Sequence, residues 1–423
     1  MDERLLLTFF YWEGVGAVDP RSLVRDYLES HPLEDQGIYL LSAGKGGAAM
    51  ALGAWETLGE RVKEGLMVIP RGWKRANLSW RVIEGEHPLP GPGSLEGGET
   101  ALELAEKAKE GDMFLLLLSG GASSLMEVPR PGLTLKDLVD VNRRLILSGA
   151  TIQETNAVRK HLSAIKGGHL TLKAWPAQVK ALVLSDVVGD LLDVIGSGPA
   201  HPDPTTFAMA LETLRRRGIL SHVPPKVVTY LQKGQKGEVP ETPKGDVPLW
   251  SRVDHHILGS NRKALETIAR MAQEKRIKPI IYTSRLHGEA REVAKVMAAL
   301  AWEETLHNEE PKLLLWGGEP TVTVKGEGKG GRAQEMALAL ALELEGWPGS
   351  FLVAGTDGID GDTRAAGAFG DGSTVSRARE KGLDPLAFLN NNDSYPFFEA
   401  LGDLFVPGVT GTNVMDVALF LLP

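Results

Sequence analysis

The stretch YLLSAGKGG, residues 39–47, passes from a run of apolar residues directly into a glycine loop that contains one lysine. The same change recurs in FLLLLSGGASS (114–124), ALVLSDVVGD (181–190), HILGSNRK (256–263), LLLWGGEP (313–320) and FLVAGTDGIDGD (351–362). Short apolar runs that end in Gly and polar residues are typical of buried strands in a parallel sheet. Because ligands bind at the carboxyl ends of such strands, the six loops predict a site for one or two highly anionic ligands.

Strand and helix patterns alternate along the chain, which predicts an α/β fold. Strands are expected at 37–43, 66–70, 113–118 and 179–185, and helices near 46–59, 94–110, 135–148 and 205–217. The amino-terminal MDERLLLTFFYWEG predicts an amphipathic helix, and the Lys-, Gly- and Pro-rich stretch from Pro224 to Pro248 predicts a linker or a long excursion. A second α/β set follows in HHILGSN, PIIYTS, KLLLWGG, TVTVKG and SFLVAGTDG, so we expect two domains, at 1–240 and 250–423.

Composition excludes several classes of protein. The 423 residues carry a net charge of −9, whereas nucleic-acid-binding proteins present a basic surface. The absence of cysteine excludes disulfides and Cys-ligated metals. No apolar run reaches the roughly 18 residues that span a membrane, and the acidic start does not resemble a signal peptide, so we expect a cytoplasmic protein.

The first glycine loop has two interpretations. Gly44, Gly46 and Ala49 match the G-x-G-x-x-A fingerprint of dinucleotide-binding proteins, and Arg71 after the next strand would suit NADP. Lys45 inside the loop adds a positive charge to the start of a helix, which favours phosphate binding. A tight turn with a solvated lysine is the structural alternative.

Loops in the first half add further polar groups. SGGASS supplies hydroxyls and backbone N–H groups from Ser119 to Ser123, and TNAVRKHL places Arg159 and Lys160 on one helix near Asn156. Asp186 and Asp190 follow a strand, where they would hold Mg²⁺ together with substrate phosphates. A helix cap or a solvated charge remains an alternative for each.

The second half brings Arg332 to the start of a predicted helix, a position that disfavours a cation unless an anion is near. Asp357 and Asp360 lie in GTDGIDGD, and Thr412 and Asn413 lie in a late glycine loop. We expect these loops to contribute to the same cleft.

Taken in order, these motifs resemble the glycerate 2-kinase family. The resemblance extends over nearly the whole chain and rests on GKGGAAMA, SGGASSL, TNAVRKHLSAIKGG, SDVVGD with GSGP, GGEPTVTV with GKGGRAQE, GTDGIDG, NNDSYPFF and GVTGTNVMD. It implies transfer of a phosphoryl group from ATP, with Mg²⁺, to the 2-hydroxyl of D-glycerate, giving 2-phosphoglycerate and ADP. It also implies a cleft between a Rossmann-like parallel-sheet domain and a smaller α/β domain named MOFRL.

Together with the loop patterns, the resemblance gives an expected site. Lys45 and Arg332 are its catalytic residues, and Asp186 and Asp190 are its metal ligands. Substrate or nucleotide binding is expected from Gly44, Gly46, Gly47, Ser119, Gly120, Gly121, Ser123, Asn156, Arg159, Lys160, Glu319, Asp357, Thr412 and Asn413.

Two other functions remain open. An NAD(P)H-dependent hydroxypyruvate reductase would use the first glycine loop and Arg71, and a non-catalytic sensor would keep the loops without needing Lys45 and Arg332. The expected partners are the small molecules glycerate and ATP, with no nucleic acid and no membrane. A homodimer is compatible with the sequence, which does not fix the oligomeric state.

Overall fold

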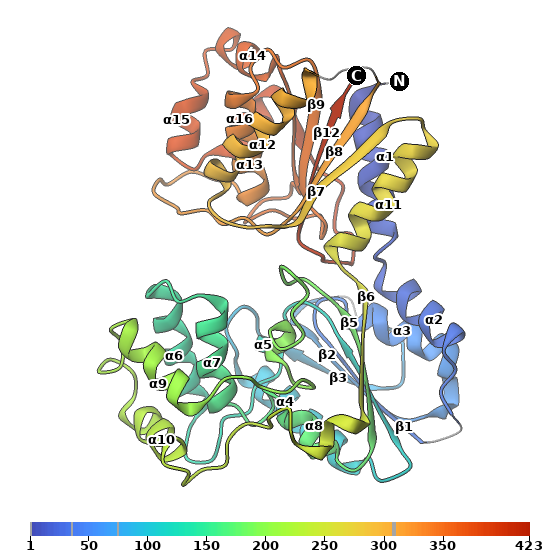
Figure 1. Cartoon of the computed structure of the whole chain (residues 1–423), viewed down its shortest axis with the longest axis vertical. Helices are drawn as coiled ribbons and strands as arrows, with labels where there is room; N and C mark the ends of the chain where they lie inside the picture. The colour runs from blue at the N-terminus through green and yellow to red at the C-terminus, as the bar shows by residue number, and fades with distance from the viewer. Residues whose placement is uncertain (1, 35–36, 74–75, 307–309) are drawn as a thin grey trace. The chain divides into compact units, whose positions relative to one another are not determined.

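The computed structural model describes residues 2–34, 37–73, 76–306 and 310–423 (Figure 1). Its contacts divide the chain into two units, which we call the amino-terminal unit (Pro20–Ser185 and Asp190–Leu258) and the carboxy-terminal unit (Met1–Asp19, Asp186–Gly189 and Gly259–Pro423). That residues 1–240 and 250–423 form two separate domains stays a prediction. In the observed contacts, the first 19 residues go with the carboxy-terminal unit.

Six strands form the sheet of the amino-terminal unit, in the order β3-β2-β1-β4-β5-β6. β1 pairs in parallel with β2 and β4, and the β2–β3 and β4–β5 pairs are also parallel. This is the strand order of the Rossmann fold, so the predicted Rossmann-like sheet is confirmed. The strands are β1 Ile38–Ala43, β2 Val62–Pro70, β3 Arg81–Gly85, β4 Met113–Leu118, β5 Gln178–Leu184 and β6 Val253–Gly259.

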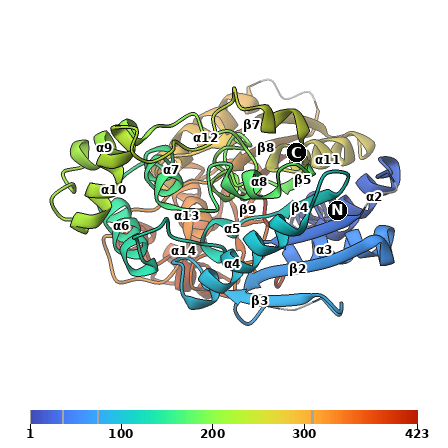
Figure 2. The same cartoon turned by 90° about the horizontal axis from the view of Figure 1, so that it is seen from below.

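Helices cover this sheet, and some of them form a separate group beside it. α6, α7, α9 and α10 pack around a core of their own, which includes Leu145, Leu211 and Leu231, and both views show them gathered beside the sheet (Figures 1 and 2). The helices of the unit are α2 Pro20–Ser30, α3 Gly47–Leu58, α4 Pro92–Lys107, α5 Ala122–Leu125, α6 Leu135–Leu147, α7 Ile152–Leu162, α8 His169–Ala174, α9 Phe207–Arg216 and α10 Pro225–Gln235, with short 3₁₀ turns at Gly59–Arg61, Ile195–Ser197 and Pro248–Arg252.

A second six-stranded sheet, ordered β11-β10-β9-β12-β8-β7, forms the centre of the carboxy-terminal unit. It is mixed, because β7 and β8 are parallel whereas β12 runs antiparallel to both β8 and β9. Its strands are β7 Lys278–Leu286, β8 Lys312–Gly318, β9 Ser350–Gly355, β10 Gly367–Asp371, β11 Leu404–Phe405 and β12 Asp416–Leu422.

Alternating residues of these strands bury against two groups of helices. Leu313 and Leu315 pack in one core with α1 Glu3–Gly16 and α11 Asn261–Glu274. Leu314 and Trp316 pack in the other, with α12 Ala290–Thr305, α13 Arg332–Glu343, α14 Thr374–Glu380, α15 Pro385–Asn390 and α16 Ser394–Leu401. The predicted amphipathic first helix is thus confirmed, and it packs against the sheet of the carboxy-terminal unit. Among the described residues, none of the helices combines the length and apolar character needed to cross a bilayer.

Two sequence-based predictions were wrong. The linker alternative for Pro224–Pro248 is wrong, because the stretch contains α10 and then an irregular excursion held by a hydrogen bond from Thr242 Oγ1 to Asp203 Oδ2 (2.9 Å). The TVTVKG segment is not a strand or hairpin. Its last two residues, Lys325 and Gly326, donate their backbone N–H groups to Asn392 Oδ1 instead of to a neighbouring strand.

Candidate functional site

The loops that follow β1 and β4 lie side by side at the switch point of the amino-terminal sheet, where the strand order reverses. Lys45 N–H donates to Gly120 O (2.8 Å), and Gly46 N–H donates to Ser119 Oγ (2.9 Å). Gly44 adopts a φ of 119°, and a Cβ there would lie 2.3 Å from Ser119 Oγ, so only glycine fits. Ligands of doubly wound sheets bind at this place.

The backbone N–H groups of the first glycine loop form hydrogen bonds within the protein. Gly44 N–H donates to Val68 O, and Gly47 N–H donates to Gly44 O, in addition to the two bonds just described. These four N–H groups are therefore engaged within the protein. What the loop presents to an anion is the amino terminus of α3, whose cap residue Gly46 supplies no side chain, and the charge of Lys45.

Lys45 lies beside a pocket of about 300 Å³ at this edge of the sheet. Within the described ranges, its ammonium has no hydrogen bond or ion pair. The other lining residues come from the ends of β2 and β3 and from the loops that follow them, and they are Pro70, Arg71, Trp73, Gly85, Glu86 and His87. Arg71 pairs with Glu86 at 2.7 Å, so the arginine that would suit NADP already has a carboxylate partner.

A second pocket, of about 150 Å³, is lined in part by the segment after β4 and is rich in charge. Glu127 and Lys166, both 2% exposed, form an ion pair of 2.6 Å within it. The remaining lining residues are His87, Pro88, Pro90, Gly121, Ser123, Ser124, Asn142 and Arg159. We call this the Arg159 pocket, and the larger one the Lys45 pocket.

Arg159 gives the smaller pocket its excess positive charge. Its Nε donates to Asn142 Oδ1 (2.7 Å), and the described part of the chain provides its guanidinium with no other hydrogen bond and no ion pair. Burial lowers the pKa of Arg159, but an arginine remains charged in any case. Since Lys166 neutralises Glu127, one positive charge is left to face a small anion.

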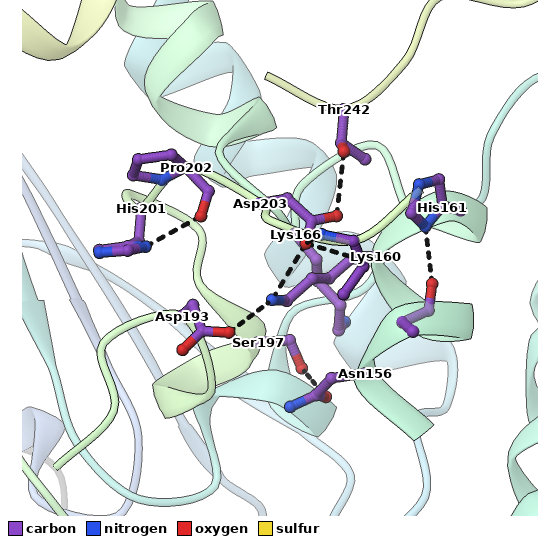
Figure 3. Close-up of polar contacts among 12 residues, drawn as sticks. Asn156, Lys160, His161, Lys166, Asp193, Ser197, His201, Pro202, Asp203 and Thr242 are labelled. Carbon is purple, nitrogen blue, oxygen red and sulfur yellow. Dashed lines mark hydrogen bonds and ion pairs between the residues drawn. The ribbon is translucent and has the colours of Figure 1, made fainter. Parts of the chain in front are cut away.

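Ser123 connects this pocket to a chain of hydrogen bonds. Its Oγ lies 2.7 Å from Ser197 Oγ. Ser197 Oγ in turn donates to Asn156 Oδ1 at 3.0 Å (Figure 3). Ser197 has a φ of 61°, a left-handed conformation that is strained for serine and is typical of functional sites. Asn156 Nδ2 is buried and has no partner in the described residues. Ser123 and Asn156 were predicted site residues, whereas Ser197 was not, although it lies in the GSGP motif.

Lys160, also expected to bind ligand, is used internally. It is 1% exposed, and its Nζ lies 3.3 Å from Asp193 Oδ2 and 3.3 Å from Asp203 Oδ1 (Figure 3). Asp203 also accepts a hydrogen bond from Thr242. The side chain of Lys160 therefore holds three segments of the amino-terminal unit together, and it does not line either pocket.

The two expected metal ligands belong to different units, Asp186 to the carboxy-terminal unit and Asp190 to the amino-terminal unit. Asp190 adopts a left-handed φ of 57°. Across the described residues there is no group of three or more His, Asp or Glu side chains arranged to hold a metal ion.

In the carboxy-terminal unit, Arg332 is the centre of an acidic cluster. Its Nε donates to Asp416 Oδ2 (2.7 Å) and its Nη1 to Glu319 Oε1 (2.6 Å). These contacts raise the pKa of Arg332 against the effect of burial. The predicted anion beside this helix start is therefore present as side chains, because Asp416 begins β12 next to the ends of β8 and β9.

Asp360 caps the same helix. It accepts hydrogen bonds from the backbone N–H groups of Ala333 (3.2 Å) and Gln334 (2.9 Å). Burial and the nearby charge of Asp416 raise the pKa of Asp360 to about 7. The amino terminus of α13 is thus occupied by a carboxylate of the protein.

The remaining expected residues of this unit lie close to one another in loops. Asp357 Oδ1 accepts from Ile359 N–H (3.2 Å), and Asn413 Oδ1 accepts from Met415 N–H (3.0 Å). Thr412 Oγ1 donates to Val18 O at 2.7 Å and is 4% exposed. The hydroxyl of Thr412 therefore ties the loop to the segment after α1.

Comparisons with known proteins identify the family. A model described as a domain of unknown function (DUF4147) matches residues 6–232, and the MOFRL family model matches residues 312–416. The D-glycerate 2-kinase of Thermotoga maritima is 39% identical over 415 residues, which cover 97% of this chain and 96% of that protein. An Agrobacterium vitis protein named "Putative hydroxypyruvate reductase" is 38% identical over 426 residues, covering 99% and 94% of the two chains.

A solved structure agrees with the sequence comparison. The crystal structure of a glycerate kinase from Thermotoga maritima superposes with a TM-score of 0.89 and 38% identity, and 99% of each chain is covered. With this agreement in sequence and in fold over nearly the full length, the chain belongs to the glycerate 2-kinase family with a MOFRL domain.

Proposed function

We propose that the protein is a D-glycerate 2-kinase, which transfers the terminal phosphoryl group of ATP to the 2-hydroxyl of D-glycerate and releases 2-phosphoglycerate and ADP. The observation that carries the proposal is the pair of pockets at the switch point. One presents Lys45 without an internal partner, and the other presents Arg159 with an excess positive charge. The family membership makes glycerate and ATP the ligands to consider first.

The Arg159 pocket suits the acid. Its volume of about 150 Å³ fits a three-carbon compound better than a nucleotide. Planar guanidinium groups bind carboxylates through two parallel hydrogen bonds, and the Nη groups of Arg159 are available for this. Ser123 and Ser124 would contact the hydroxyls of the substrate.

The Lys45 pocket suits the nucleotide. It is twice as large, and Pro70 and Trp73 give it apolar surface for a base or ribose. The amino terminus of α3 and the ammonium of Lys45 would receive the phosphates. Catalysis of phosphoryl transfer depends mainly on positioning and on neutralising charge, which is the role we assign to Lys45 and Arg332.

Asp186 and Asp190 remain the proposed ligands of Mg²⁺. Two carboxylates suffice for a Mg²⁺ ion that also binds phosphates and water, so the donor set fits this metal. When bound, Mg²⁺ would neutralise charge on the phosphates. The cleft between the domains, the cytoplasmic location and a homodimer also stay predictions.

The test is product analysis. Purified protein is incubated with ATP, Mg²⁺ and D-glycerate, and the phosphorylated acid is identified by ³¹P NMR, which separates 2-phosphoglycerate from 3-phosphoglycerate. Parallel reactions contain L-glycerate, or hydroxypyruvate with NADPH. We expect 2-phosphoglycerate and ADP in equal amounts and no oxidation of NADPH. Oxidation of NADPH without release of ADP would establish the reductase instead, and 3-phosphoglycerate would contradict the assigned regiochemistry.

A further inference from the structure

His87 lies where the two pockets meet, and it lines both of them. A Cβ added at Gly121 would lie 3.2 Å from His87 Cδ2, 3.5 Å from His87 Nε2 and 3.7 Å from Lys45 Cγ. The imidazole edge and the lysine stem therefore both lie over the β4 loop. If the acid occupies one pocket and the nucleotide the other, this is where the substrate hydroxyl meets the terminal phosphate.

From this geometry we infer that His87 is the general base of the reaction. As the 2-hydroxyl oxygen of glycerate forms a bond to the terminal phosphorus of ATP, the O–H bond breaks and its proton passes to His87 Nε2. The bond between that phosphorus and the bridging oxygen breaks, and ADP leaves with the electron pair. After the products leave, the protonated ring returns its proton to solvent. The inference rests on the proposed function.

The carboxylates that line the two pockets are already engaged. Glu127 pairs with Lys166 and accepts from Ser163 Oγ at 2.6 Å. Glu86 pairs with Arg71 and accepts from the backbone N–H of Ser94 at 3.0 Å. Within the described ranges no hydrogen bond or ion pair occupies either ring nitrogen of His87. The imidazole is thus the available proton acceptor among the groups that line these pockets.

The surroundings keep this imidazole neutral. Although His87 is exposed, packing of its ring against the loops and, second, the charge of Lys45 lower its pKa below the usual 6.5. A neutral ring at pH 7 accepts a proton, and histidine is the side chain most often used in this way. The charged groups around His87 in the two pockets are Lys45, Arg71, Glu86, Glu127, Arg159 and Lys166.

The experiment compares His87→Gln with wild type and with His222→Gln. His222 is an exposed histidine whose ring contacts Ser221, and it lines neither pocket, so its variant is the matched control. We expect His87→Gln to lower kcat by about 10²-fold, in line with general-base contributions of 10²–10⁴. The KM values for ATP and glycerate should change much less.

The pH profile separates catalysis from a structural role. In wild type and in His222→Gln, kcat/KM should decline below pH 6.5 as His87 becomes protonated. That decline should be absent in His87→Gln, and imidazole added to His87→Gly should restore part of the rate.

Each contrary result is distinct. An unchanged acidic decline in His87→Gln, or a kcat within a few-fold of wild type, would overturn the inference while the kinase activity stands. Absence of 2-phosphoglycerate with the wild-type protein would instead overturn the proposed function. Because His87 is exposed, we expect its variants to fold, and circular dichroism checks this.

Discussion

Replacing Arg159 by methionine tests the proposed acid site directly. Methionine keeps much of the aliphatic volume of the side chain but removes its positive charge. That charge has no partner in the pocket, because Glu127 is already paired with Lys166. A hydrogen bond to a charged group contributes about 1.5–3 kcal/mol, which corresponds to roughly a 10- to 150-fold change in an equilibrium constant. Since the carboxylate is bound both before and during transfer, the loss should raise KM for glycerate and leave kcat within a few-fold.

The same substitution has a separate effect on stability. Asn142 is 4% exposed and accepts from Arg159 Nε, so its amide oxygen would lose this donor in the variant. An unsatisfied buried group costs about 1–3 kcal/mol in the free energy of unfolding. Urea unfolding measures this cost independently of the kinetic effect.

The assay is a glycerate titration at saturating ATP. Arg144→Met is the control, because Arg144 forms a half-buried ion pair with Asp140 (2.9 Å) and lines neither pocket. Glyceramide, which lacks the carboxylate, should be a poor substrate for the wild-type enzyme. Its kcat/KM should fall little further in Arg159→Met, because the arginine has no carboxylate to bind. An unchanged KM for glycerate in Arg159→Met would refute the assignment, as would an equal loss with glyceramide.

Three further predictions concern other charged groups. Lys45→Ala and Arg332→Ala should each lower kcat by about 10²-fold or more in steady-state assays. Only Arg332→Ala should also lower the melting temperature, because it leaves carboxylates unpaired. A near-normal kcat in either variant would remove that residue from the mechanism. Lys166→Met should cost about 3–5 kcal/mol in chemical denaturation, since Glu127 stays buried without its partner, and a cost below 1 kcal/mol would contradict this. Asp360 holds a proton between about pH 4 and 7 when folded but not when unfolded, so its contribution to the free energy of unfolding falls as pH rises through this range. Asp360→Asn should therefore weaken that decline in urea titrations at several pH values, whereas an identical slope would show that Asp360 is ionised throughout.

The apolar runs made most of the amino-terminal sheet predictable. MFLLLL at 113–118 is β4 with every residue buried, and a run of this kind has few other interpretations. The strand Arg81–Gly85 was missed because it is short and partly exposed at the edge of the sheet. TVTVKG was misread because β-branched alternation favours a strand, whereas the distant side chains of Asn392 and Asn391 bind the backbone N–H groups of Gly326, its last residue, and of Glu327, which follows it.

The candidate site was predictable only where one loop carried it. Lys45 stands out in its own sequence context, as a cation at the start of a helix. The partner of Arg332 could not be predicted, because Asp416 is 84 residues away and meets it only through strand pairing. His87 was missed for a similar reason: a lone histidine before a proline carries no signal, and only the folded loops place it beside both pockets.

Helix α1 has a consequence for how the chain is made. Leu7, Phe10 and Tyr11 are at most 1% exposed, and the Tyr11 hydroxyl donates to Gly355 O at 2.8 Å. Helix α1 thus bonds to a strand residue that is synthesised 344 residues later. The amino-terminal unit has all its segments by residue 258 and can fold in the meantime. A fragment beginning at Pro20 would keep that unit intact and leave an apolar face of the carboxy-terminal sheet uncovered.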